Sequence, residues 1–227
     1  MSIIGSMFGK KAATPNPIRE TLFGDLPLDA WPKDGEPTDA LPWGGFVSAR
    51  IHLQSGNQAD AIAWWCYILE QPGLEPRHYL QAWHYLRQHG QQPPPEVAKQ
   101  VLGVVIEVAM PEGLDLLAAY PDHSARYYNY SGAGVVWDHP DTSLDHPIDQ
   151  ILAASQRIVD KIGPWDKERP VPPPSGQTRM SFLTPSGLHF GQAPMAALMR
   201  DPLAHGVIDW ATALMKILIV KAQTAKR

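Results

Sequence analysis

The chain has 227 residues, with 19 Lys and Arg against 23 Asp and Glu, so its formal net charge is −4. Its 44% apolar and 19% charged residues are typical of globular proteins, and exclude the polar, highly charged composition of disordered chains. The slightly acidic charge balance argues against nucleic-acid binding. The sequence contains no run of 18 apolar residues, the length that a membrane-spanning helix needs. We therefore expect a protein that binds neither nucleic acid nor a membrane.

The opening residues MSIIGSMFGKK lack the long apolar region and small-residue cleavage site of a secretory signal. The single cysteine, Cys66, cannot form an internal disulfide. We therefore expect a cytoplasmic protein. Cys66 lies in the apolar run AIAWWCYIL, which predicts a buried position.

Residues 1–42 are predicted to form an extended proline-rich arm. They hold six of the 23 prolines, and each proline fixes φ and removes a backbone donor. One short helix at most is expected, around residues 18–23. The arm also carries apolar residues, among them Leu22, Phe23 and Trp31, which are too many for a free linker. We expect the arm to wrap over the domain.

Residues 43–102 are predicted to form a helical subdomain. Apolar spacings of three and four indicate two helices joined by a turn at Gly56, a third helix ending at Gly90, and a fourth opened by Pro94 and Pro95. The first two helices resemble a single tetratricopeptide unit at six positions: Ala49, Gly56, Ala61, Trp65, Leu69 and Pro72. Because the second copy is interrupted by prolines, we expect a helical hairpin beside a sheet, not a solenoid.

Residues 103–227 are predicted to form an α+β subdomain that packs with the helical one as a single globular unit. Four short runs rich in Val, Ile, Tyr and Trp indicate an antiparallel meander. The meander is followed by a helix over 147–162, a β-hairpin turning at Pro185-Ser186-Gly187 and a long C-terminal helix over 201–222. The fold class is therefore α+β. The hairpin can join the meander in one sheet with the last two helices on one face, but the pattern leaves the strand order open.

Exposed aromatic side chains are typical of protein contact surfaces. The candidates are Tyr128, Tyr130 and Trp137 in the meander and Trp165 in the proline-rich connector. The alternative is that the arm or the first helices cover the meander residues. The C-terminal helix is apolar over much of its circumference, which favours packing on two surfaces or self-association.

The segment DHPDTSLDHPID, residues 138–149, concentrates metal-ligating side chains. His139, Asp141 and His146 are the candidate ligands, with His123 or His189 converging from elsewhere, since catalytic zinc or iron needs three protein ligands and an open position. The competing interpretation is a solvated strand-to-helix connection in which Asp145 or His146 caps the helix.

Enzyme signatures are otherwise missing from the sequence. It contains no GxSxG elbow, no phosphate-binding loop and no dinucleotide fingerprint, so we expect no cofactor. Asp122-His123-Ser124 lie in one tight turn and are interpreted as turn residues, because triad members come from separated elements. We expect a non-enzymatic cytoplasmic protein-binding or scaffolding protein; the alternative is a small metal-assisted hydrolase using residues 138–149.

Overall fold

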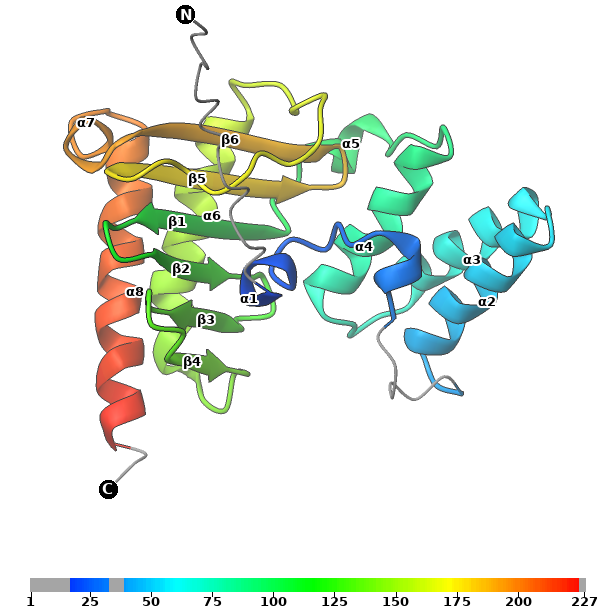
Figure 1. Ribbon diagram of the computed structural model, residues 1–227, viewed down its shortest axis with the longest axis horizontal. Coiled ribbons are helices and arrows are strands. Elements are labelled where there is room, and N and C mark those ends of the chain that lie inside the picture. Colours follow the sequence, from blue (N-terminus) through cyan, green and yellow to red (C-terminus); the bar gives the residue numbers. More distant parts are fainter. Residues whose placement is uncertain (1–16, 33–38, 225–227) are drawn as a thin grey trace, which may run out of the picture.

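The computed structural model describes residues 17–32 and 39–224 and confirms an α+β fold (Figure 1). The helices are α1 (Pro17–Glu20), η1 (Leu28–Ala30), α2 (Trp43–Gln54), α3 (Gln58–Glu70), α4 (Pro76–Gln88), α5 (Pro95–Ala98), η2 (Thr142–Leu144), α6 (Asp145–Val159), α7 (Met195–Leu198) and α8 (Ala204–Thr224). The strands are β1 (Gly103–Ala109), β2 (Leu114–Ala119), β3 (Ala125–Tyr128), β4 (Gly134–Trp137), β5 (Gln177–Thr184) and β6 (Gly187–Pro194).

All six strands form one antiparallel sheet in the order β4-β3-β2-β1-β5-β6. The meander β1–β4 therefore occupies one half of the sheet, and the late hairpin β5–β6 extends it beyond β1. Val105 of β1 pairs with Ala118 of β2 on one side and with Ser181 of β5 on the other. The hairpin thus joins the meander, which the sequence pattern allowed, and β1 becomes an interior strand.

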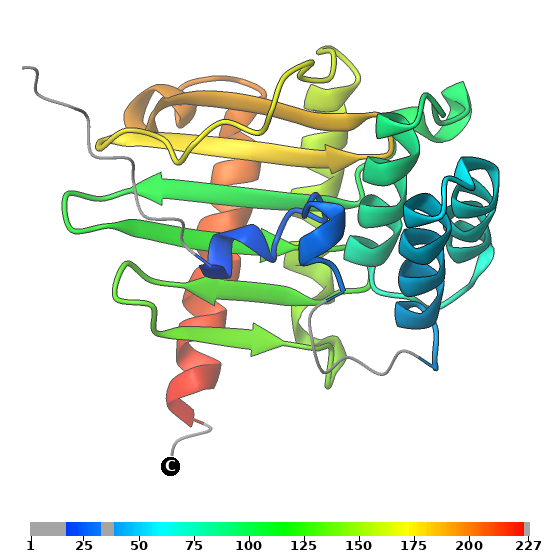
Figure 2. The same cartoon turned by 45° about the vertical axis from the view of Figure 1, so that its right-hand side comes forward.

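Helices α6 and α8 cover one face of the sheet, as expected (Figure 2). Side chains alternate along a strand, so Val104 and Ile106 of β1 face these helices while Val105 faces away. The largest core lies here, where Ile148 and Ile151 of α6 and the α8 residues meet the strands. The buried residues of α8 form one stripe: Ala204, Val207, Ile208, Ala211, Leu214 and Leu218.

The described part of the arm, residues 17–32, packs across the opposite face of the sheet, as expected (Figure 2). Leu22 and Phe23 are buried against the strand residues Val105 and Leu116. Tyr120, fully buried at the end of β2, donates a hydrogen bond from its hydroxyl to the Leu22 carbonyl at 2.6 Å. The remaining arm residues, 1–16 and 33–38, lie outside the described ranges.

Helices α2, α3 and α4 form a separate small core beside the sheet, around Phe46, Trp65 and Tyr85. The α2–α3 pair is the predicted helical hairpin. Cys66, however, is exposed, which corrects the expected burial. The reason is the helical period: Trp65 and Ile68 turn their side chains inward, and Cys66 lies about 100° further round the helix from Trp65.

The two long helices after the meander begin at residues other than the expected ones. Helix α6 begins at Asp145 and has Pro147 inside its first turn, where a missing N–H costs nothing. Asp201 caps the start of α8, as its carboxylate accepts hydrogen bonds from the amides of Leu203 and Ala204 at 2.9 and 2.8 Å. Within the described residues, no helix combines the length and apolar character that a membrane crossing requires.

Candidate functional site

The four aromatic candidates do not form one surface. Trp137 is only 8% exposed and belongs to the core beneath α6 and α8, with the Lys221 ammonium 4.4 Å from its ring centroid. The structure thus corrects the expectation that Trp137 marks a surface. The strand alternation explains it: Val135 and Trp137 of β4 point toward the helices.

Of the other three candidates, Tyr128 and Tyr130 lie near the β3–β4 turn, and Trp165 lies at the opposite edge of the sheet. Tyr128 is half-buried against the arm side, and Tyr130 is 54% exposed in the turn between β3 and β4. Trp165 is 38% exposed in the connector, where its ring packs 5.2 Å from that of Phe190 on β6. Because β4 and β6 are opposite edge strands, Tyr130 and Trp165 belong to different surfaces.

Trp165 lies on a cleft of about 520 Å³, a size common for ligand sites. Four segments far apart in the sequence form it, namely the arm, α4, the connector after α6 and the β5–β6 turn. The lining residues are Phe23, Gly24, Asp25, Leu80, His84, Arg87, Gln88, Gln92, Pro164, Trp165, Asp166, Lys167, Glu168, Arg169, Leu183, Thr184, Ser186, Gly187 and Leu188. Sequence patterns reveal elements and not their meeting points, so this site was not predicted.

The arginines of the cleft differ in their ionic partners. Arg169 is paired: its Nε donates to Asp25 at 2.6 Å, its Nη2 bonds to Glu20, and its guanidinium stacks 4.2 Å from the Phe23 ring centroid. Arg87 is half-buried at the C-terminal end of α4 and donates from Nη1 to the Pro185 carbonyl. Among the described residues, no carboxylate lies within 4 Å of the Arg87 guanidinium.

Burial changes the titration of two groups in this cleft. It lowers the pKa of Arg87 to about 10, so the guanidinium remains charged at neutral pH. It also lowers the pKa of His84 to about 4, so that imidazole is neutral. In the described part of the chain, Asp25 Oδ1 and Arg169 Nη1 are buried without a hydrogen-bond partner. The cleft therefore holds two cations without an ion pair among the described residues, the half-buried Arg87 and the exposed Lys167, together with unsatisfied polar atoms.

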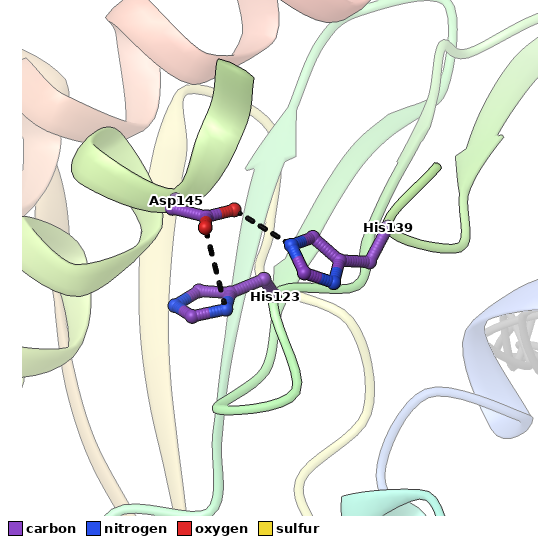
Figure 3. A group of neighbouring side chains, drawn as sticks. All are labelled: His123, His139 and Asp145. Carbon is purple, nitrogen blue, oxygen red and sulfur yellow. Dashed lines mark hydrogen bonds and ion pairs between the residues drawn. The ribbon is translucent and has the colours of Figure 1, made fainter. Parts of the chain in front are cut away.

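A second candidate site lies at the same end of the strands but toward the β4 edge of the sheet, where His123, His139 and Asp145 converge (Figure 3). His123 belongs to the β2–β3 turn, His139 to the connection after β4, and Asp145 is the first residue of α6. The Asp145 carboxylate places Oδ1 2.9 Å from His139 Nε2 and Oδ2 3.9 Å from His123 Nδ1. Each of its oxygens thus faces one imidazole.

Backbone conformation sets the two histidines apart. Within the described ranges, His123 (φ 60°) and His139 (φ 53°) are the two non-glycine residues with positive φ. The left-handed region costs an L-residue roughly 1 kcal/mol or more, and glycine or asparagine usually occupies it. In the turn around His123, Asp122 Oδ1 accepts a hydrogen bond from the Ser124 amide at 3.0 Å. These three are turn residues, as expected.

The predicted ligands Asp141 and His146 lie elsewhere. Asp141 accepts a hydrogen bond from the Ser143 amide at 2.8 Å, which caps η2, and it faces Lys221 at 3.7 Å. His146 packs edge-on against Trp210 of α8, with ring centroids 5.1 Å apart. His189 is fully buried on β6, beside Thr184. Of the predicted set, the structure brings together His139 and His123, and adds Asp145.

No protein-family model, curated protein or solved structure matches the chain, so its geometry alone supports the functional conclusions.

Proposed function

We propose that the protein is a non-enzymatic binding protein that docks an acidic segment of a partner protein in the cleft beside Arg87. The observation that carries this proposal is the Arg87 guanidinium, half-buried and charged at neutral pH, with no carboxylate within 4 Å in the described part of the chain. A partly buried charge without a counter-ion is costly, so a ligand that supplies a carboxylate there gains binding energy.

Backbone dipoles compensate this charge only in part. Arg87 lies in the last turn of α4, where the helix dipole favours a cation, and it donates to the neutral Pro185 carbonyl. The acidic residue that acts on it most strongly, Asp25, is engaged by Arg169 at 2.6 Å. The guanidinium therefore retains donors and charge for an incoming carboxylate.

The neighbouring residues favour a protein segment as the ligand. Trp165 is partly exposed on the same cleft and offers an apolar ring, with the Lys167 ammonium 5.4 Å from its centroid. Trp and Arg are the residues most enriched at the energetic centres of protein interfaces. An acidic side chain on Arg87 and an apolar or aromatic one on Trp165 would engage both groups.

The exposed, unpaired Cys66 supports a reducing, cytoplasmic setting.

Selection of random peptides on the full chain tests the proposal. We expect enrichment of peptides that carry Asp or Glu next to an apolar residue, with affinity that falls as salt concentration rises. Arg87→Gln and Trp165→Ala should each weaken binding of the selected peptide at least about tenfold, as expected for central interface residues. Arg200→Gln is the matched control, because Arg200 is exposed and outside the cleft.

Three results would overturn this function. The first is selected peptides without acidic residues, or no enrichment at all. The second is equal binding of the peptide to wild type and Arg87→Gln. The third is displacement of the peptide by millimolar acetate or phosphate alone, which would identify the cleft as a site for a small anion.

Self-association through α8 is a second candidate, favoured by Val220, which is 61% exposed on the face away from the sheet. Leu214 and Leu218 are buried in the core, so only the outer residues could contact a second copy. A dimer in sedimentation experiments that becomes monomeric in Val220→Asp would support it. A wild-type monomer at all concentrations would exclude it without affecting the cleft.

A further inference from the structure

We infer that His123, His139 and Asp145 bind one divalent transition-metal ion of the zinc type, with Asp149 orienting His123. This inference is independent of the peptide cleft, which is lined by none of these residues. It rests on donor chemistry and geometry from three separate segments of the chain (Figure 3).

The donor atoms lie close to the positions that a metal requires. Zinc binds imidazole nitrogen and carboxylate oxygen at about 2.0–2.1 Å, so tetrahedral donors lie about 3.3 Å apart. In this cluster the donor atoms are all within 4.8 Å of one another. His139 Nε2 donates a hydrogen bond to Asp145 Oδ1 at 2.9 Å, and a bound metal ion would take the place of that proton. His123 Nδ1 lies 3.9 Å from the other oxygen, Oδ2. Small side-chain rotations would complete the site.

The hydrogen bond from His123 to Asp149 selects the ring nitrogen that faces the site. His123 Nε2 lies 3.0 Å from Asp149 Oδ1, and since a carboxylate only accepts, Nε2 carries the proton. The lone pair of the neutral ring is then on Nδ1, which faces the Asp145 carboxylate at 3.9 Å. In that tautomer Nδ1 can bind a metal ion together with the Asp145 carboxylate. Carboxylates bonded in this way to ligating histidines are a common feature of metal sites.

The donor set indicates the class of metal. Two imidazoles and one carboxylate suit zinc and its transition-metal neighbours, whereas calcium and magnesium prefer oxygen ligands throughout. All three side chains are partly exposed, so water can complete the coordination. A bound metal would connect the β2–β3 turn, the connection after β4 and the start of α6.

The experiment uses full-length, tag-free, metal-stripped protein titrated with zinc in a calorimeter, with metal content measured by mass spectrometry. We expect one zinc per chain and a higher melting temperature with zinc. His123→Gly and His139→Gly should each weaken zinc binding at least about tenfold while folding normally, because glycine suits the positive φ at both positions. Asp145→Asn should do the same.

Two further variants separate this site from weak surface binding. Asp149→Ala should weaken zinc binding about tenfold through the loss of its bond to His123. His205→Gln is the control, since His205 and Asp209 form an exposed histidine–carboxylate pair at 3.2 Å on α8. Binding of less than one zinc per chain, equal affinity in wild type and His139→Gly, or an equal loss in His205→Gln would each overturn the inference.

Discussion

The Arg19 guanidinium donates from Nε to Oε1 of Glu107 at 2.6 Å, across 88 positions of sequence. Glu107 is fully buried in β1, and Arg179, its cross-strand partner on β5, lies 3.6 Å from the other carboxylate oxygen. The arm is therefore held on the sheet by a buried ionic contact in addition to apolar packing.

Loss of this carboxylate is expected to destabilise the fold strongly. Glu107→Gln removes the ion pair of the buried Arg179 and leaves Arg19 with the partly exposed Glu20, so the free energy of unfolding should fall by about 3–5 kcal/mol. Arg19→Met should cost less, because Arg179 still faces Glu107. Urea unfolding followed by circular dichroism measures both, with the exposed Glu96→Gln as control. A loss below about 1 kcal/mol in Glu107→Gln, as for surface ion pairs, would contradict this account.

Stability is expected to fall in mild acid because of His78. Burial against Trp43 lowers the pKa of this imidazole from 6.5 to about 4, so the folded state binds its proton less readily than the unfolded state. The stabilisation is complete above pH 6.5 and is lost as the pH falls toward 4, at roughly 1 kcal/mol per unit.

Urea midpoints measured between pH 7.5 and 4.5 test this titration. His78→Gln should show a shallower dependence on pH than wild type, and the exposed His205→Gln should not. Identical pH profiles for wild type and His78→Gln would show that the imidazole does not cause the loss.

Arg87 is expected to contribute to ligand binding and not to the stability of the fold. Replacement by Met removes a half-buried charge that lacks a counter-ion and keeps the apolar stem, so the melting temperature without ligand should stay equal or rise. Binding of the selected acidic peptide should be lost in the same variant. Thermal unfolding monitored by calorimetry gives the comparison, and a marked fall in melting temperature would instead make Arg87 a structural residue.

Two tryptophans proposed together as surface residues should behave differently on truncation. Trp137→Ala opens a cavity in the core and is expected to cost about 3–5 kcal/mol of unfolding free energy. Trp165→Ala, at a partly exposed site, should cost less than half of that. Chemical denaturation of the two variants side by side distinguishes them, and equal losses would refute the assignment of Trp137 to the core and Trp165 to the surface.

The elements of this fold were predictable because their signals are local. Apolar spacing located the helices, and short β-branched runs between turn residues located the strands. The order of the strands was not predictable, because nothing in the sequence around Gly103–Ala109 shows that β1 pairs with β5. Glu107 within the run VVIEVA did carry a signal, because a charge in a buried strand requires a partner, but the sequence does not identify Arg19 as that partner.

The candidate sites were predictable only in part, for a related reason. The Asp/His-rich segment was recognisable by composition, yet which members converge depends on the left-handed backbone at His139 and on a turn that brings His123 from another strand pair. Of the cleft residues, the sequence pattern singled out Trp165 alone as a binding candidate. The lining residues come from four segments, and Arg87 in isolation resembles any arginine at the end of a helix.

The interior position of β1 has a consequence for synthesis on the ribosome. Until residues 177–184 have emerged, β1 presents an unpaired edge that can associate with other chains. The arm also lacks two of its contacts until later in synthesis, because Glu20 bonds to Arg169, 149 residues downstream, and Arg19 bonds to Pro170, 151 residues downstream. Completion of the sheet must therefore wait for the last quarter of the chain, and products truncated before β5 should aggregate.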